Sequence, residues 1–290
     1  MDGLVAVELD GRAVLRIGGP DRTGFLQNLV SADVTRVAGG HAVWSALLTP
    51  QGKYLADFFL YPSEDSFLLD TEAELAADLL RRLTLYRLRA KVTIEQPEPA
   101  LRVFALLGGG AAAAVGLPSE PGACRSVPGG IAAVDPRPVE LGVRMVSDRM
   151  PELPMARPGS FTDWDRARLA AGVPDGTHDL VVEKTTLLEA GFDELGGVDF
   201  AKGCYVGQEL TARMKYRGLL KKRLLPVAID GEAPPPGTPL LGPDGREAGE
   251  MRSSCGELGL ALVRLEAADQ ELSAGASRLQ VRRPAWLPPG

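Results

Sequence analysis

The sharpest chemical feature of the sequence is a cysteine close to a lysine, inside a segment that also contains two glycines. This signature segment (residues 199–209) reads Asp-Phe-Ala-Lys-Gly-Cys-Tyr-Val-Gly-Gln-Glu and contains Lys202 and Cys204. Apolar residues recur at 206, 210 and 214, so we expect a helix to begin near Tyr205 or Val206. A nearby positive charge and a helix N-terminus both favour the thiolate form of a cysteine. A thiolate can act as a nucleophile, a redox sensor or a transient ligand of a metal cluster.

The alternative for this cysteine is a buried and inert thiol, which is common for free cysteines and stays open. Two other features give weaker signals. Glycines 108–110 follow an apolar run, but Gly116 and Pro118 end the next helix too early for a dinucleotide site. His41 and His178 have no partner residue at ligand or catalytic spacing.

A basic segment (residues 213–223) follows the signature segment and holds six positive charges with no acid among them. These residues are Arg213, Lys215, Arg217, Lys221, Lys222 and Arg223. Such a run is either a solvated face or an anion site for a polyglutamate tail, a phosphate or RNA. The sequence alone does not separate these two interpretations.

Hydrophobic patterning predicts mixed α and β elements that would position these residues. Residues 4–9 and 13–17 are short apolar runs around Asp-Gly and predict a hairpin. Residues 43–48 and 54–61 predict two strands joined by the turn Thr-Pro-Gln-Gly. After residue 218, short apolar segments separated by turn signals predict a small β-barrel.

Helix and strand signals continue along the chain. The run Thr-Glu-Ala-Glu at 71–74 is a capping box and predicts a helix N-terminus. Residues 88–94 alternate between apolar and mostly basic side chains, which predicts a half-exposed strand. Thr162 or Asp163 is expected to cap a helix that carries Trp164.

Length and composition indicate a globular chain of several domains. The chain has 290 residues, with 45% hydrophobic and 24% charged residues. We expect three units, an α+β unit at 1–97 that can interleave with the next, a second at 98–217 and a barrel at 218–290. The net charge of −6 argues against a protein that coats nucleic acid. Three cysteines, an odd and sparse count, argue against a disulfide framework.

The sequence also bears on the location of the protein. The longest uncharged run, residues 103–119, contains glycines and a proline and is too short for a membrane span. The first residues lack the basic and apolar segments of a signal peptide. We therefore expect a cytoplasmic protein without a membrane segment. The abundance of Ala, Gly, Arg and Pro suggests a GC-rich bacterial genome.

The signature segment resembles the K-G-C-Y/F-x-G-Q-E signature of YgfZ-type folate-binding proteins, which are similar to the aminomethyltransferase (T-protein) of the glycine cleavage system. Residues 46–53, 86–92 and 195–200 resemble further motifs of that family. The resemblance extends over most of the chain. The matching signature positions are Lys202, Gly203, Cys204, Tyr205, Gly207, Gln208, Glu209 and, after them, Arg213.

The resemblance implies an α+β fold with three domains in a ring-like aminomethyltransferase arrangement, a central folate pocket and a C-terminal β-barrel. It implies tetrahydrofolate, or a derivative, as the cofactor. Trp164 would stack on the pterin and Glu183 would accept from its ring NH groups. Asp70 and Asp78 flank the place where a transferase holds an acid near the folate. Cys204 and Lys202 would carry any chemistry.

The resemblance also implies a role with iron–sulfur client or assembly proteins and a connection to tRNA modification. Our first hypothesis is therefore a tetrahydrofolate-binding factor that supports assembly or repair of iron–sulfur enzymes. The second is a folate-dependent aminomethyl or one-carbon transferase. The third is a non-catalytic scaffold that docks RNA or apo-enzymes through the basic segment. We expect a monomer that does not bind nucleic acid under the first two hypotheses.

Overall fold

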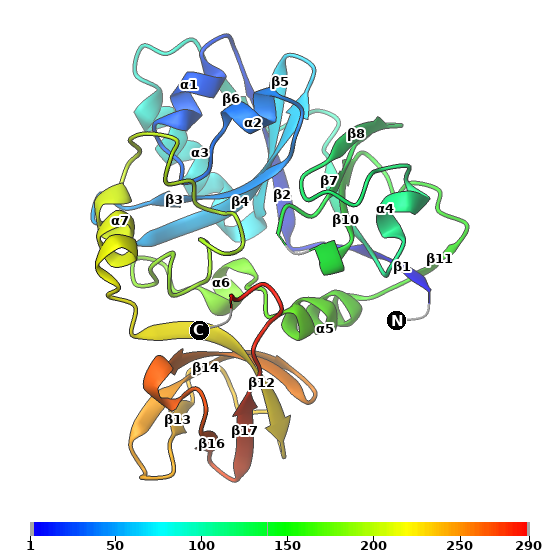
Figure 1. Cartoon of the computed structure of the whole chain (residues 1–290). Helices are drawn as coiled ribbons and strands as arrows, with labels where there is room; N and C mark the ends of the chain where they lie inside the picture. The colour runs from blue at the N-terminus through cyan, green and yellow to red at the C-terminus, as the bar shows by residue number, and fades with distance from the viewer. Residues whose placement is uncertain (1–2, 138, 289–290) are drawn as a thin grey trace.

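Two β-sheets share one hydrophobic core, and a closed β-barrel lies below them (Figure 1). The computed structural model describes residues 3–137 and 139–288. Within these ranges, none of the helices has the length and apolar character needed to cross a membrane.

The first sheet has five strands, and each hydrogen-bonded neighbour is antiparallel. In spatial order they are β3 (Val43–Leu48), β4 (Tyr54–Ser63), β5 (Ser66–Glu72), β2 (Arg12–Gly18) and β6 (Thr93–Glu95). Three helices pack on its outer face, namely α1 (Arg22–Gln27), α2 (Thr35–Ala38) and α3 (Ala73–Arg87).

The second sheet has six strands and contains one parallel pair, β1 with β11. In spatial order they are β11 (Ala156–Pro158), β1 (Leu4–Glu8), β7 (Arg102–Leu107), β10 (Val143–Ser147), β9 (Gly130–Val134) and β8 (Cys124–Val127). The short helix α4 (Ala111–Ala114) and the 3₁₀ turn η1 (Val139–Leu141) belong to this half. Strand β1 therefore lies in the second sheet, although it precedes the strands of the first sheet in the chain.

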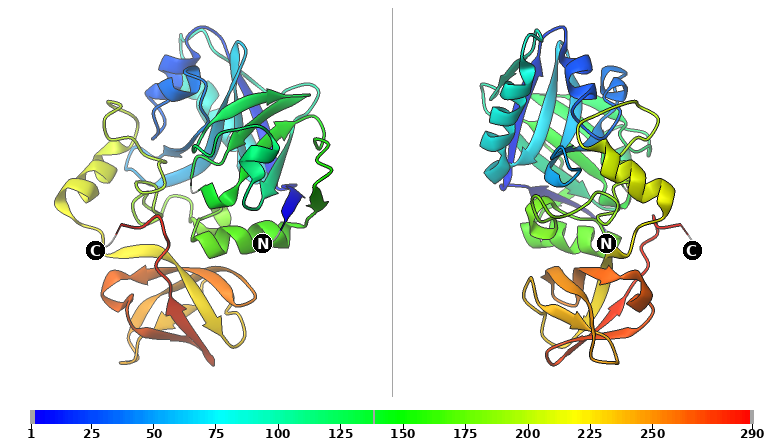
Figure 2. Two further views of the ribbon diagram at one scale, coloured as in Figure 1. Left: turned by 45° about the vertical axis from the view of Figure 1, so that its right-hand side comes forward. Right: turned by 90° about the vertical axis from the view of Figure 1, so that its left-hand side faces the viewer.

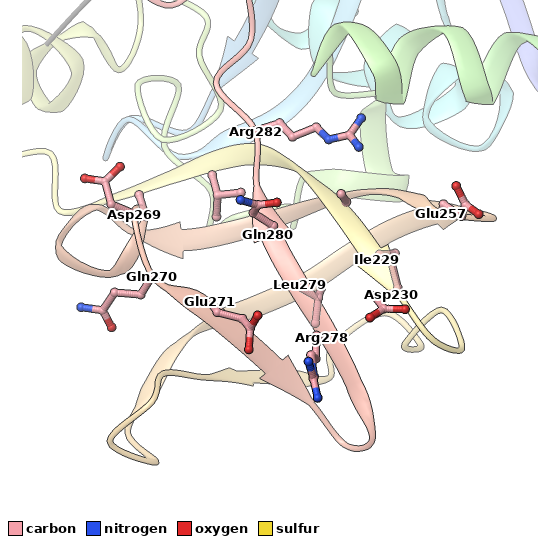
Figure 3. A pocket seen from close by; sticks show the side chains of 13 residues that line it. Ile229, Asp230, Glu257, Asp269, Gln270, Glu271, Arg278, Leu279, Gln280 and Arg282 are labelled. Carbon is pink, nitrogen blue, oxygen red and sulfur yellow. The ribbon is translucent and has the colours of Figure 1, made fainter.

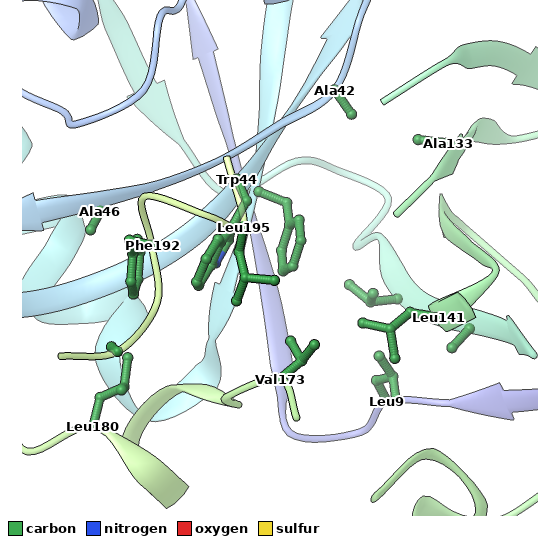
Figure 4. Close-up of a cluster of buried hydrophobic side chains, with 14 of the residues drawn as sticks. Leu9, Ala42, Trp44, Ala46, Ala133, Leu141, Val173, Leu180, Phe192 and Leu195 are labelled. Atoms are coloured by element: carbon green, nitrogen blue, oxygen red, sulfur yellow. The ribbon is translucent and has the colours of Figure 1, made fainter. Parts of the chain in front are cut away.

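Strand alternation explains the layers. Phe59 and Tyr61 on β4 face the core shared by the two sheets, whereas Phe58 and Leu60 face the helices on the outer side. Successive side chains of a strand point to opposite faces, so one buried strand supplies both cores. Figure 4 shows part of the shared core, where Trp44 stacks on Phe192 with ring centroids 3.8 Å apart.

The chain between the sheets and the barrel contains three helices, α5 (Phe161–Ala171), α6 (Gly176–Asp179) and α7 (Gln208–Arg217). The barrel, seen below the sheets in both views of Figure 2, closes through six strands. In order around it they are β12 (Lys222–Asp230), β15 (Leu258–Arg264), β14 (Glu247–Cys255), β13 (Pro239–Leu241), β16 (Glu271–Ala274) and β17 (Ser277–Val281), with the 3₁₀ turn η2 (Leu265–Ala267) after β15.

The predicted hairpin at residues 4–17 is wrong. Strand β1 pairs with β7 and β11, whereas β2 pairs with β5 and β6, so the Asp-Gly turn carries the chain from one sheet to the other. The strand pair at 43–48 and 54–61 is confirmed and forms β3 and β4. A turn sequence fixes a local reversal but not the partner of each strand, because sheet pairing depends on distant segments.

Two further local predictions fail for related reasons. Thr71 lies inside β5 and its hydroxyl donates to the Asp57 carbonyl, so it does not cap α3, which begins at Ala73. The predicted strand at 88–94 shrinks to β6, because residues 88–92 form the turn that reverses the chain after α3. Helix α5 carries Trp164 as expected, although its capping box uses Ser160 with Asp163.

Candidate functional site

The signature segment is a loop followed by the first turn of α7, and it is fastened at two points to the connection between α1 and α2. The Asp199 N–H donates to the Ser31 carbonyl at 3.0 Å, and the Val206 N–H donates to the Asn28 carbonyl at 3.2 Å. The residues between these two bonds form the loop of the signature segment. Cys204 lies in this loop and is exposed to solvent.

Cys204 differs from the other two cysteines in its exposure. Cys124 and Cys255 are half-buried, and burial raises the pKa of the Cys124 thiol to about 12. Helix α7 begins only at Gln208, after the N-cap Gly207. The helix N-terminus is therefore farther along the chain from the cysteine than predicted, and what singles out Cys204 is access to its sulfur.

Lys202 does not extend freely beside the cysteine. Its Nζ donates to the Val30 carbonyl and lies 5.2 Å from the ring centre of Tyr205. Burial lowers the pKa of Lys202 to about 8, although Asp33 and Asp199 partly oppose this. The lysine therefore helps to hold the loop on the connection between α1 and α2.

This shift predicts a pH dependence of stability. Folded Lys202 loses its proton near pH 8, whereas an ordinary lysine does so near 10.5. Between these values the unfolded chain binds more protons, so the Lys202 contribution to the free energy of unfolding rises with pH. Below about pH 8 both states hold the proton and the penalty of burial is constant.

Urea unfolding of the Lys202→Met variant across this pH window tests the expectation. The difference in unfolding free energy between wild type and variant should shift in favour of the wild type as the pH rises from about 8 to 10.5. A difference that stays constant over the window would show that Lys202 titrates normally.

Glycine at 207 is required by a close approach between the signature segment and the β3–β4 turn. Gly207 has φ 80°, and a Cβ there would lie 2.4 Å from the Thr49 carbonyl oxygen. On the other side, a Cβ on Gly52 would lie 2.7 Å from the Gly207 carbonyl oxygen. The two motifs at 46–53 and 199–209 therefore pack directly on each other.

Gly207→Ala is expected to lower the free energy of unfolding by about 2 kcal/mol, since the new methyl meets backbone at a left-handed residue. The matched control is Gly203→Ala, because Gly203 has φ 96° but open space where a Cβ would stand. The control should lose only about 1 kcal/mol, from backbone conformation alone. Urea denaturation measures both, and equal losses would contradict the close approach.

Of the remaining signature residues, some stabilise the turn before α7 and others are exposed on the helix. The Tyr205 N–H donates to Oε1 of Gln208 at 3.2 Å, which closes the turn before α7. Tyr205 is buried, and burial raises the pKa of its hydroxyl to about 12 against a hydrogen bond from Thr211. Glu209 and Arg213 are exposed on α7.

A second cluster, of buried charges, lies between the two sheets. The Asp70 carboxylate on β5 is fully buried and accepts from Arg12 on β2 and Arg144 on β10, each at 2.6 Å. Tyr61 donates to the same carboxylate at 3.4 Å, and the Arg144 guanidinium lies 4.0 Å from the ring centre of Phe59. Burial raises the pKa of Asp70, but the two guanidinium groups lower it further, so the net pKa is lowered.

Trp164 on α5 adjoins this cluster. Its side chain is 1% exposed, and Arg144 lies 5.5 Å from its ring centre. Its Nε1 donates to Asp175 at 3.4 Å. Trp164 and Asp70 therefore meet around one arginine, which lies against the indole ring and also neutralises the carboxylate.

Glu183 is not part of this cluster. It is exposed, has φ 62°, and its backbone N–H donates to the Tyr54 carbonyl at the start of β4. The structure thus brings together two of the three residues predicted to hold a folate. The third lies at the surface, so the three do not converge on one ligand.

Comparisons with known proteins show the family and the fold to which this chain is similar. The human mitochondrial iron–sulfur cluster assembly factor IBA57 is 36% identical in an alignment covering 97% of this chain and 84% of the human protein. The chain belongs to the IBA57 family. The mouse relative is 34% identical with the same coverage, and the Neurospora crassa homologue is 30% identical over 83% of this chain and 57% of its own length.

The fold of this IBA57-family chain is that of the aminomethyltransferases. The glycine cleavage system aminomethyltransferase T from Bartonella henselae superposes with a TM-score of 0.81, covering 98% of this chain and 86% of that one at 15% identity. Residues 221–289 match the family model of the CAF17 C-terminal β-barrel domain. The predicted α+β, three-part architecture with a C-terminal barrel is confirmed.

Two predictions about origin need correction. The IBA57 relatives from human, mouse and Neurospora crassa are named as mitochondrial proteins, which contradicts the predicted cytoplasmic location. They are also eukaryotic proteins, so they do not support the bacterial origin suggested by composition. The cytoplasmic prediction rested on the lack of a secretory signal peptide and of a membrane span, and neither feature distinguishes a cytoplasmic from a mitochondrial protein.

Sequence reasoning missed the buried arginines of the IBA57-family fold. The Arg137 guanidinium donates hydrogen bonds to the Asp135 carboxylate and to the Pro174 carbonyl. It also lies 4.7 Å from the ring centre of Phe59. The available signal was a charged residue inside an apolar strand, as with Arg144 in the run 143–147. Such a residue must find a buried partner.

The barrel has a polar groove of its own, with a volume of about 630 Å³. Figure 3 shows its charged lining, which includes Asp230, Glu257, Asp269, Glu271, Arg278 and Arg282. None of the predicted site residues lies in its walls. The signature segment is attached to the connection between α1 and α2, so this groove is a separate feature.

Proposed function

We propose that this chain is an iron–sulfur cluster assembly factor in which the Cys204 thiol contacts the cluster or the client protein. Membership in the IBA57 family supports the role. The single observation that carries the residue assignment is the exposure of Cys204 on a loop held at both ends by backbone hydrogen bonds. A fixed and accessible sulfur is what a ligand or nucleophile requires.

The chemistry of such a thiol is that of a soft ligand. Thiolates bind iron–sulfur clusters, which normally take about four protein ligands. Of the three cysteines, only Cys204 is exposed, so this chain supplies one ligand and a partner supplies the rest. Shared ligation suits a factor that passes a cluster on. When the single bond to Cys204 breaks, the cluster stays with the ligands of the partner.

Complementation tests the function. Cells that lack their own IBA57-type factor and express this chain should recover the activity of their iron–sulfur enzymes. Enzymes without clusters serve as the reference. Normal expression and folding without recovery would contradict the assembly role.

Tetrahydrofolate remains a prediction of the family resemblance, and the predicted residues do not fit it as they stand. Asp70 is saturated by two arginines, and Trp164 is buried beneath Arg144. Glu183 lies elsewhere at the surface. We therefore assign no step to folate in the proposed mechanism.

Titration of intrinsic fluorescence with folinic acid decides the folate question. From the packing around Trp164 we expect no saturable quenching that depends on this residue. A binding curve in the wild type that Trp164→Phe abolishes would restore the pterin assignment. The melting temperature of the variant serves as the control for folding.

The other two hypotheses gain less support from the site. A transferase needs a carboxyl group that exchanges a proton near neutral pH, and the ion pairs of Asp70 hold its pKa below the usual range. In the basic segment, Lys215 pairs with Asp193 and Arg223 pairs with Glu194. Docking of RNA and the monomeric state stay untested predictions.

A further inference from the structure

Helix α3 ends in a turn that holds a large apolar side chain in solvent. Leu88 is 88% exposed and has φ 45°, a conformation that side-chain-bearing residues rarely adopt. Leu85 and Tyr86 beside it are 64% and 39% exposed. Neighbouring exposed apolar side chains mark interaction surfaces, and backbone strain is found at functional segments.

Positive charge surrounds these apolar side chains. Residues 79–91 include five arginines and lysines and no acid. Asp78 pairs with Arg81 and Arg82. Among the described residues, Arg89 and Lys91 have no ion-pair partner, and both are exposed. We call residues 85–91 the α3 patch, a positive and apolar surface on a chain of net charge −6.

The exposure of the α3 patch does not come from a loose chain. The Lys91 N–H donates to Oδ2 of Asp21 at 2.7 Å, and the Asp21 N–H donates back to the Lys91 carbonyl at 3.4 Å. A Cβ on Gly19 would lie 2.2 Å from that same carbonyl oxygen. Val92 is 4% exposed and anchors the turn in the core beneath the helices.

Helix α1 joins the α3 patch to the signature segment. Asp21, which binds the patch, directly precedes α1, and Asn28, which binds Val206, directly follows it. The helix has six residues and is about 9 Å long. In Figure 1, α1 lies above the loop that leads into α7, with α3 beside it. A partner footprint of standard size, roughly 30 Å across, would cover both features.

We propose that the α3 patch docks an acidic partner protein and so positions the partner's cluster ligands at Cys204. This inference rests on the proposed function and adds the surface through which the partner binds. Leu88 supplies apolar contact, and Arg89 and Lys91 attract the acidic surface and set its orientation. The α3 patch thus places positive charge and exposed apolar side chains together on a chain whose net charge is −6.

Complementing cells with patch variants tests the proposal. The variants are Leu88→Ser, Leu88→Gly and the double change Arg89→Glu with Lys91→Glu. Each should lower iron–sulfur enzyme activity at least fivefold, with the melting temperature and the alkylation rate of Cys204 unchanged. Leu88→Gly should melt at the same or a higher temperature, because glycine relieves the positive φ. The charge-conserving double change Arg89→Lys with Lys91→Arg should keep full activity.

Matched controls lie on the barrel, namely Leu265→Ser and the double change Arg282→Glu with Arg283→Glu, and both should remain active. Full activity of the α3 patch variants, beside an inactive Cys204→Ser, would overturn the docking surface and leave the proposed function intact. An active Cys204→Ser would overturn the proposed function itself.

Vesicles containing phosphatidylserine test whether the α3 patch binds a membrane instead of a protein. Binding by the wild type that is lost in the patch variants would assign the surface to a membrane and overturn protein docking.

Discussion

Cys204→Ser is expected to lower the recovery of iron–sulfur enzymes in complemented cells at least tenfold while leaving the fold intact. The side chain is exposed, so its sulfur makes no packing contribution that a hydroxyl would fail to replace. A serine hydroxyl is a poor ligand for iron–sulfur clusters and a weak nucleophile without an activating base. The measurement is enzyme activity per amount of expressed protein, with the melting temperature recorded for each variant.

The matched control is Cys255→Ser, at a half-buried cysteine on β14 in the barrel. It removes a thiol of the same type from a place away from the signature segment and should complement fully. Full complementation by Cys204→Ser would refute the role of the sulfur. Equal losses in both variants would assign the effect to general damage.

Asp70→Ala is expected to destabilise the fold by about 3–5 kcal/mol, the cost typical of breaking a buried ion pair. The carboxylate is fully buried and accepts from both Arg12 and Arg144. Its removal leaves two buried guanidinium groups without their counter-charge. For a chain of this size the melting temperature should fall by roughly 10 °C.

The control for this change is Asp78→Ala, which also removes a carboxylate bonded to two arginines, Arg81 and Arg82. Because that cluster lies at the surface of α3, its loss should cost less than about 1 kcal/mol. Urea unfolding compares the two variants directly. Similar small losses would mean that Asp70 is not the charge that holds Arg12 and Arg144.

The fold could be predicted from the sequence where local patterns and pairing agree. Strands β3 and β4 are adjacent in the chain and in the sheet, so the turn sequence at 49–52 was sufficient to predict their pairing. Strands β1 and β2 are adjacent only in the chain, and β1 pairs with β7 and β11, which follow it by about a hundred residues or more. Thr71 matched a capping box but was needed in β5, since sheet pairing outweighs a single cap.

The site was predictable only in part, for similar reasons. The residues around Cys204 stood out because glycines and charges interrupt an apolar pattern. The start of α7 was misplaced because Val206, which continues the helical period, packs against the first sheet before the helix begins. The partners of Asp70 were missed because patterns assign arginine to the surface, whereas Arg144 is buried on a central strand.

The proposed function depends on one reactive thiol that the signature segment presents to solvent. Alkylation of the native protein with a maleimide, followed by peptide mapping, measures the rate at each of the three cysteines. We expect Cys204 to react at least tenfold faster than Cys124 and Cys255, at a rate that Gly207→Ala alters. Protection of Cys204 to the level of the two half-buried cysteines would refute the proposal.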